Sequence, residues 1–180
     1  MKDIFSRLVC YFKSAFSDSI RIGGTFHYEH WRNGVLIDSW SESNLITNEG
    51  LDSILNVSLR AATQITAWYI GIFEANYTPV ATVTAATITA ASTESTAYAE
   101  ATRPVFTSPL STARSLTNTA SKATFTINAT KTVYGAFLVS SSAKSGTTGV
   151  LMAASKNAVA RAVVSGDILT VDYTVNIASA

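Results

Sequence analysis

Residues 168–177 read ILTVDYTVNI, and this stretch decides the fold class. Its apolar side chains occupy every second position: Leu169, Val171, Tyr173, Val175 and Ile177. A period of two is typical of a strand with one buried face and one solvated face. β-rich segments separated by turn signals precede it, at 123–127, 133–139, 149–154 and 158–164. Short strands at this spacing predict a β-sandwich or a closed barrel.

A hairpin is predicted within residues 25–41, where Arg32-Asn33-Gly34-Val35 joins two β-rich runs. Asn-Gly between such runs favours a type I′ turn, which needs a positive φ at both central residues. A simple two-residue register sets Glu29 opposite Asp38, an unfavourable pairing of like charges. The pattern therefore predicts the hairpin rather than its register.

One short internal helix is expected within residues 44–55, NLITNEGLDSIL. Thr47 or Asn48 is the expected N-cap, and the spacing of the apolar residues places Leu51, Ile54 and Leu55 on the buried side. We expect this helix to close one end of a sheet. The following run at 68–73, WYIGIF, is nearly continuous in aromatic and β-branched residues, which is typical of a strand buried on both faces.

Residues 74–100 are rich in Ala and Thr, contain Pro79 and have no strong period. We interpret them as a long excursion with at most one short strand or turn. Glu94 and Glu100 stand out as its carboxylates, and in a segment without a predicted scaffold we expect them to be solvated or interfacial. Beyond it, Pro104 marks an edge or the start of a further β-like run.

The N-terminal segment, residues 1–19, is predicted to be an amphipathic helix or arm in front of a single domain at 20–180. Three- and four-residue spacing places its apolar side chains on one stripe: Ile4, Phe5, Leu8, Val9, Phe12 and Phe16. The stripe either packs on the domain's own sheet or docks onto another subunit. Charges at Asp3, Arg7 and Lys13 interrupt the linear run of apolar residues, which argues against a signal peptide or membrane span, so we expect a soluble, unprocessed protein.

Composition narrows the partners. The 180 residues are 47% hydrophobic and 14% charged, against about 25% charged in an average soluble domain. A net charge of +1 creates no field that would attract nucleic acid, and the polar side of the N-terminal helix lacks the basic excess of membrane-surface helices. The single cysteine, Cys10, excludes an intramolecular disulfide and leaves no CxxC motif.

Residues that could carry chemistry are sparse. His27 and His30 fall on opposite faces of one predicted strand, and a metal site of His27, Glu29 and Asp38 is a weak constellation. No Gly-x-Ser-x-Gly motif is present, and the loop 141–149 lacks the glycines of a phosphate-binding loop, so Lys144 is expected to be exposed. We therefore predict no enzymatic activity, no catalytic residue, no metal and no cofactor.

From Asn44 onward the chain resembles the cement, decoration or head-associated proteins of tailed bacteriophages. The similar segments are 44–55, 68–79, 94–106 (ESTAYAEATRPVF), 123–127, 133–143 (VYGAFLVSSSA) and 145–151. The resemblance implies an all-β fold, a jelly-roll-like antiparallel β-sandwich, that oligomerises and stabilises the shell from outside. Its expected partners are the major capsid protein and further copies of itself, as a dimer or trimer. It would be made in the cytoplasm of the bacterial host and reside on the capsid surface of the virion.

Aromatic and apolar anchors are expected to carry such contacts, because aromatic residues dominate interface hot spots. The candidates are Phe5, Leu8, Phe12 and Phe16 of the N-terminal helix and Trp31, Trp40, Tyr77, Tyr98 and Phe106 of the domain, whereas Trp68 is expected in the domain's own core. The alternatives are a tail-fibre or tail-tip module that binds a receptor or carbohydrate and, in third place, a small hydrolase or other enzyme.

Overall fold

The computed structural model describes residues 19–111 and 113–179, so the predicted N-terminal helix, with Phe5, Leu8, Phe12 and Phe16, lies outside the described residues. The strands are β1 (Ile20–Arg32), β2 (Val35–Ser43), β3 (Leu45–Ile46), β4 (Trp68–Phe73), β5 (Val105–Phe106), β6 (Ser115–Thr117), β7 (Ala123–Thr126), β8 (Lys131–Val139), β9 (Leu151–Val163) and β10 (Ile168–Ser179). The helices are α2 (Asn48–Leu59), α3 (Ala85–Ser92) and the 3₁₀ turn η1 (Thr119–Ser121).

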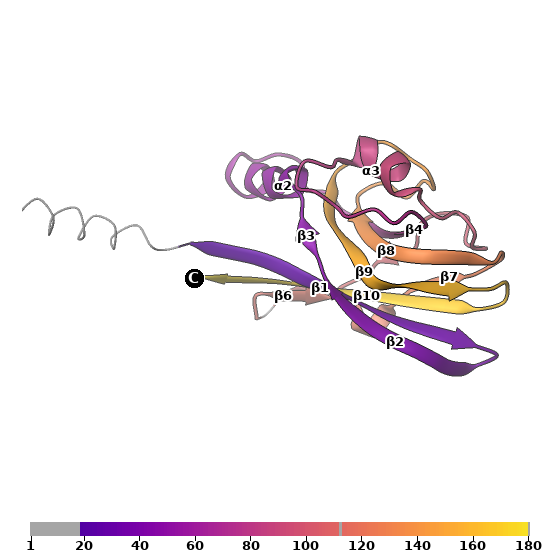
Figure 1. Cartoon of the computed structure of the whole chain (residues 1–180). Helices are drawn as coiled ribbons and strands as arrows, with labels where there is room; N and C mark the ends of the chain where they lie inside the picture. Colours follow the sequence, from indigo (N-terminus) through magenta and orange to yellow (C-terminus); the bar gives the residue numbers. More distant parts are fainter. Residues whose placement is uncertain (1–18, 112, 180) are drawn as a thin grey trace, which may run out of the picture.

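Two five-stranded antiparallel sheets make up the molecule (Figure 1). In the first sheet, called sheet A, the order is β2-β1-β10-β6, and β7 also pairs with β10. In the second, sheet B, the order is β3-β9-β8-β4-β5. The predicted all-β sandwich is therefore present.

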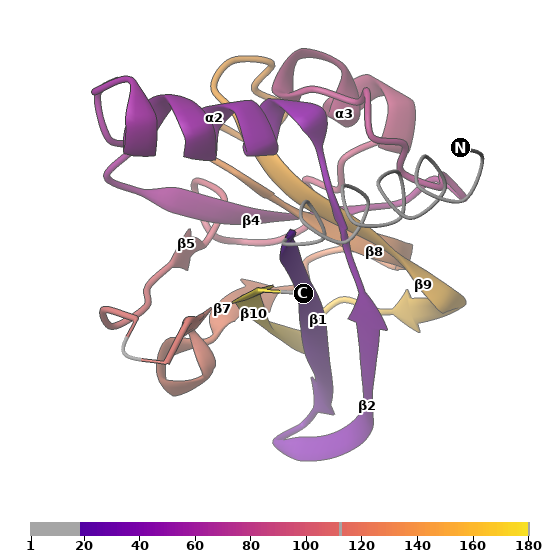
Figure 2. The same cartoon turned by 90° about the vertical axis from the view of Figure 1, so that its left-hand side faces the viewer.

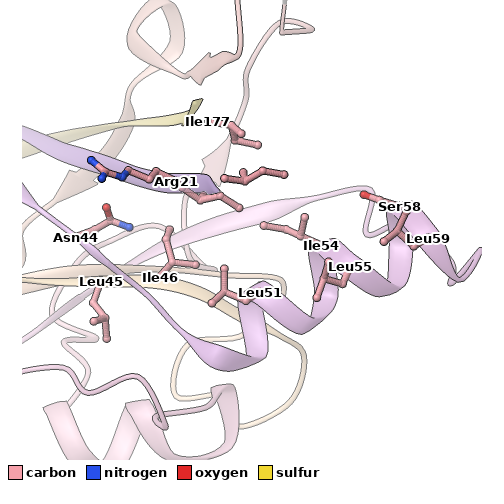
Figure 3. A pocket seen from close by; sticks show the side chains of 12 residues that line it. Arg21, Asn44, Leu45, Ile46, Leu51, Ile54, Leu55, Ser58, Leu59 and Ile177 are labelled. Carbon is pink, nitrogen blue, oxygen red and sulfur yellow. The ribbon is translucent and has the colours of Figure 1, made fainter. Parts of the chain in front are cut away.

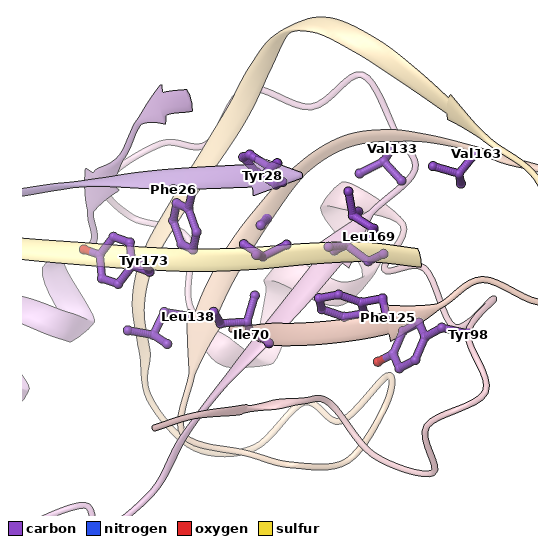
Figure 4. Close-up of a cluster of buried hydrophobic side chains, with 14 of the residues drawn as sticks. Phe26, Tyr28, Ile70, Tyr98, Phe125, Val133, Leu138, Val163, Leu169 and Tyr173 are labelled. Atoms are coloured by element: carbon purple, nitrogen blue, oxygen red, sulfur yellow. The ribbon is translucent and has the colours of Figure 1, made fainter. Parts of the chain in front are cut away.

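The core lies between the sheets (Figure 4). Sheet A contributes Phe26, Tyr28, Leu169 and Tyr173, and sheet B faces them with Ile70 and Leu138, among others. The rings of Phe26 and Tyr173 stack with centroids 4.4 Å apart across β1 and β10. The alternation in residues 168–177 thus correctly predicts the buried face of β10 up to Tyr173. Beyond it, β10 runs past the sandwich, and Ile177 is 42% exposed.

The predicted hairpin joins β1 to β2 through Asn33 and Gly34, whose φ angles of 51° and 77° fit the expected turn. The ladder shifts between His30 and Trp31, so that His30, rather than Glu29, lies opposite Asp38. This bulge removes the unfavourable pairing of carboxylates that a simple register requires.

The excursion at 74–100 corrects the prediction, because it contains α3 and packs closely. Val83, Ala85 and Ile88 are buried against the outer face of sheet B, on Phe137 and Leu151. Four alanines supply the helix-forming residues, and the backbone N–H of Thr84 donates to Thr87 Oγ1 at 3.1 Å at its first turn. With α3 on one side and the core on the other, β4 and β8 are covered on both faces, as predicted for residues 68–73.

Strand β9 corrects a second prediction, since segments 149–154 and 158–164 form one strand rather than two. Lys156 pairs with Gly135 and Arg161 with Val133, so β9 contains extra residues between these pairs. Asn157 falls between the two predicted strands, is buried and donates its side-chain N–H to the carbonyl of Val133 at 3.3 Å. The polar signal therefore marks a bulge inside a strand.

Helix α2 begins as predicted, with Thr47 as N-cap: its Oγ1 accepts the N–H of Gly50 at 3.1 Å. Gly50 is the one buried residue of the helix. A side chain at this position would collide with Met152 of β9, so the close contact requires glycine. The predicted buried side is wrong: Leu51 is 38% and Leu55 54% exposed. The helix lies against β9 at its first turn and runs along the top of the view in Figure 2. Its apolar residues Leu51, Leu55 and Leu59 stay exposed.

Candidate interaction surfaces

The tip of the β1–β2 hairpin is an exposed apolar surface. Val35, Leu36 and Ile37 follow the turn, and their exposed fractions are 62%, 44% and 46%. Figures 1 and 2 show this hairpin projecting from the body of the sandwich. We call these three residues the hairpin tip.

The end of β1 beside the turn is fixed by Asp167, whose carboxylate is almost fully buried. Arg32 donates to both carboxylate oxygens at 2.7 and 2.8 Å, and His30 Nε2 lies 2.7 Å from Oδ2. The backbone N–H of Val164 donates to the same oxygen at 2.8 Å. These contacts, the Arg32 hydrogen bonds foremost, hold the pKa of Asp167 well below its usual value despite its burial.

The middle of the hairpin is held by stacking and by charge. Trp40 stacks on Tyr28 with ring centroids 4.8 Å apart, and the Arg161 guanidinium lies 4.8 Å from the Trp40 centroid. Arg161 also forms an ion pair with Asp38 at 2.9 Å. Burial, with the nearby Glu42 carboxylate, raises the pKa of Tyr28 well above its usual value. Specific contacts therefore hold the β1 residues opposite the hairpin tip and the strands just behind it.

The outer face of sheet A is polar and internally bonded around Glu29. Lys122 Nζ donates to Glu29 at 2.6 Å, Thr170 Oγ1 at 3.2 Å and the Trp31 indole N–H at 3.3 Å. The Lys122 hydrogen bond is the main cause that lowers the pKa of Glu29. Lys122 also reaches Asp172 at 3.4 Å. The half-buried Trp31 and His27 complete this face.

An apolar groove opens between α2 and the ends of β1, β3 and β10 (Figure 3). It encloses about 900 Å³ and is lined mainly by Ile20, Ile22, Ile46, Leu51, Leu55 and Ile177. Arg21, Asn44 and Ser58 are the polar residues of its lining. The apolar side of α2 that was expected to be buried thus forms one wall of this groove.

A buried ion pair joins the excursion to the loop between β8 and β9. Arg103 is 1% and Glu94 8% exposed, and two hydrogen bonds of 2.7 Å connect them. Arg103 also donates to the carbonyl oxygens of Ser141 and Gly146, and Glu94 accepts the N–H of Ser145 at 2.7 Å. Every charged group of this pair is hydrogen-bonded, which makes it a structural clasp.

The candidate interface residues separate into two groups. Trp40 and Tyr98 are 9% and 1% exposed and lie in the core, so they are corrected to core residues. Trp31, Tyr77 and Phe106 are partly exposed. Phe106 packs beside Tyr173, and Tyr77 packs on the cluster beneath α3. The sequence analysis missed the hairpin tip, although its three consecutive apolar residues directly after Asn-Gly were the available signal.

Glu94, Glu100 and Lys144 also lie in surroundings that differ from the predicted ones. Glu94 is buried, whereas Glu100 accepts the backbone N–H of Thr126 at 3.0 Å, so the two act separately. Lys144, expected to be exposed, donates to the carbonyl of Tyr98 at 2.7 Å and lies 3.8 Å from its ring centroid. His27 lies 4.0 Å from Glu29, but Asp38 is bound to Arg161. Within 19–111 and 113–179, no group of three His, Cys, Asp or Glu side chains could hold a metal ion.

Comparison with known proteins finds no matching family model and no matching curated protein. Among the described residues, no helix is both long enough and apolar enough to span a membrane.

Proposed function

We propose that this chain is a non-enzymatic capsid cement protein that binds the outside of a bacteriophage head. The observation that carries the proposal is the hairpin tip, where Val35, Leu36 and Ile37 project from the sandwich. Adjacent apolar residues at a projecting site favour a protein–protein contact, since single exposed apolar residues scattered over a surface need no such explanation. The resemblance described above supplies the kind of partner.

The contacts that hold the hairpin support this role. Binding costs free energy whenever a loop or a set of side chains must be ordered. Asp167 with Arg32 and His30 beside the turn, and Trp40 between Tyr28 and Arg161 behind it, already hold the strands in place. A preformed apolar tip of this kind can insert between neighbouring capsid subunits with little ordering cost.

The finer features of the proposal are a jelly-roll-like topology, self-association and residence on the virion surface. The pairing of the first described strand, β1, with the last, β10, in one sheet supports a jelly-roll-like path. The partners are the major capsid protein and further copies of the chain, as a dimer or trimer, and synthesis takes place in the host cytoplasm. Several weak contacts made at once raise the avidity for a symmetric shell.

The test is rebinding of the purified chain to heads that lack it, measured by co-sedimentation. The double variant Leu36→Asp/Ile37→Asp is expected to lose at least tenfold in affinity, because it places two charges where apolar residues make contact. Val80→Asp is the matched control, since Val80 is 53% exposed and lies outside the hairpin. Failure of the unaltered chain to bind heads, or unchanged binding of the double variant, contradicts the proposal.

The second candidate is a tail-fibre or tail-tip module that binds a receptor or carbohydrate. The outer face of sheet A favours it, because Trp31 and His27 lie beside the Glu29 carboxylate. Copy number per particle separates the two functions: a cement protein approaches the abundance of the major capsid protein, and a tail module numbers in single copies to tens. Particles without a cement protein should release DNA on heating, whereas particles without a tail module should stay intact and fail to adsorb.

A further inference from the structure

The groove beside α2 is lined by apolar side chains that are largely exposed. Leu55 and Leu59 of its helical wall are 54% and 75% exposed, and Ile20 and Ile177 opposite them are 75% and 42% exposed. Figure 3 shows the side chains of Leu51, Ile54 and Leu55 directed from α2 towards the strand that carries Arg21. Apolar walls that face each other across an open space of about 900 Å³ fit an apolar ligand or chain segment.

The N-terminal segment, which directly precedes β1, carries an apolar stripe that suits the apolar lining of the groove. In residues 1–16, helical spacing gathers Ile4, Leu8, Phe12 and Phe16 on one stripe and leaves Lys2, Arg7 and Lys13 outside it. This stripe would be about 18 Å long from Ile4 to Phe16, at 1.5 Å per residue. The α2 residues that line the groove run from Leu51 to Leu59, about 12 Å, which is the length of the stripe from Leu8 to Phe16.

The connection between the segment and the groove is short. Described structure begins at Ser19, and Ile20 and Ile22 are already part of the groove lining. Only Ser17, Asp18 and Ser19 separate Phe16 from the groove, and all three are polar residues that suit a chain reversal. So short a connection gives the segment a high effective concentration at the groove, which a free partner or a second copy would have to exceed.

We propose that residues 4–16 of the same chain form an amphipathic helix that folds back into this groove. The helix then covers the apolar side of α2 and the ends of β1 and β10, and it closes the open end of the sandwich. Phe12 and Phe16 lie against Leu55 and Leu59, and the basic residues of the helix face solvent. This proposal is independent of binding to a capsid.

Distance measurement between two spin labels on the full chain tests the proposal. Cys10, the one cysteine of the sequence, lies opposite the apolar stripe and carries one label. Asn56→Cys provides the other site, on an exposed position of α2 outside the groove lining. The expected result is one narrow distance distribution that persists when the labelled chain is diluted into excess unlabelled chain.

Two charge substitutions, each made in the labelled chain, locate the contact. Phe12→Asp on the segment and Leu55→Asp in the groove should each broaden the distribution and raise the fluorescence of an added apolar dye several-fold. Val80→Asp, exposed and distant from the groove lining, should change neither reading. Leu55 is already half-exposed, so its replacement leaves the fold intact, and near-ultraviolet circular dichroism verifies this.

Other occupants give different results, and each overturns the proposal. A narrow distribution that disappears on dilution means that the segment docks onto a second copy. A distribution that is broad in the unaltered chain means that the groove awaits an outside partner. A narrow distribution that Leu55→Asp leaves unchanged means that the segment packs elsewhere.

Discussion

The outer side of sheet B and the β1–β2 hairpin of sheet A use the same residue type in opposite ways. Ile88 of α3 is completely buried against sheet B, whereas Ile37 of the hairpin is 46% exposed. The first region is closed by α3 and by the buried Glu94–Arg103 ion pair. The second is held by Asp167 beside the turn, and its apolar tip is left exposed. We infer that apolar residues stabilise the fold in the first region and are available for association in the second.

The largest effect is expected from opening the clasp of the closed region. Glu94→Ala should lower the free energy of unfolding by about 3–5 kcal/mol, because it leaves the buried Arg103 guanidinium without its counter-charge. Chemical denaturation measures this loss. The double variant Glu94→Leu/Arg103→Met should recover most of it, since no unpaired charge remains. A small loss in the single variant would show that the pair is solvated.

Replacing the two isoleucines compares the regions directly. Ile88→Ala should cost about 2–5 kcal/mol, the usual range for a buried aliphatic side chain. Ile37→Ala should change the free energy of unfolding by no more than about 0.5 kcal/mol, as is usual at exposed positions. Equal costs for the two variants would remove the distinction between a closed and an open region.

The contribution of Asp167 to the free energy of unfolding should depend on pH. Asp167→Asn is expected to cost about 1.5–3 kcal/mol at neutral pH, the usual value for hydrogen bonds to a charged group. The pKa of Asp167 is lowered in the folded state, so its contribution is complete above the unfolded value of about 3.9 and is lost as the pH falls below it. The difference in unfolding free energy between the unaltered chain and the variant should therefore shrink from pH 5 to pH 2, as urea titrations can measure. A constant difference would contradict this assignment.

An effect smaller than that of Asp167→Asn is expected at the hairpin turn. Gly34 has a φ of 77°, and a Cβ there would meet no atom within 4 Å. Gly34→Ala should therefore cost only the strain of a left-handed residue, about 1–2 kcal/mol. Gly23→Ala is the control, because Gly23 is equally open and has no positive φ. Urea denaturation of both variants measures the cost of the positive φ, because neither added methyl group meets another atom.

The parts of the fold that the sequence predicts are those with local signals. The alternation at 168–177 correctly predicts the inner face of β10, Asn33-Gly34 predicts the hairpin, and Thr47 is the N-cap of α2. In each case a few neighbouring residues determine the backbone geometry. Helix α3 was missed because Thr and Ile are weak helix formers, and the packing of Val83 and Ile88 on sheet B overrides that weakness.

The candidate interaction surfaces were predicted less well, since a surface is available only where no other part of the chain covers it. Helical spacing correctly groups Leu51, Ile54 and Leu55 on one side of α2, but it does not tell what lies opposite that side. Tyr98 and Trp40 are predicted as interface anchors, but both are core residues. Tyr98 packs edge-on against Phe125, and Trp40 stacks on Tyr28. The sequence predicts two strands at 149–154 and 158–164, and the bulge that joins them into β9 arises from pairing with β8.

The pairing of β1 with β10 determines when the sandwich can be completed. Phe26 lies opposite Tyr173, so the central ladder of sheet A joins residues from the two ends of the described chain. Contacts between such distant residues form slowly, because the loss of chain entropy on loop closure precedes the gain from pairing. During translation, α2 and the β1–β2 hairpin can form from local contacts, but the edge of β1 that pairs with β10 has no partner until β10 has left the ribosome. The nascent chain therefore lacks the Tyr173 ring that stacks on Phe26 throughout most of its synthesis, and this interval is when it depends most on protection from aggregation.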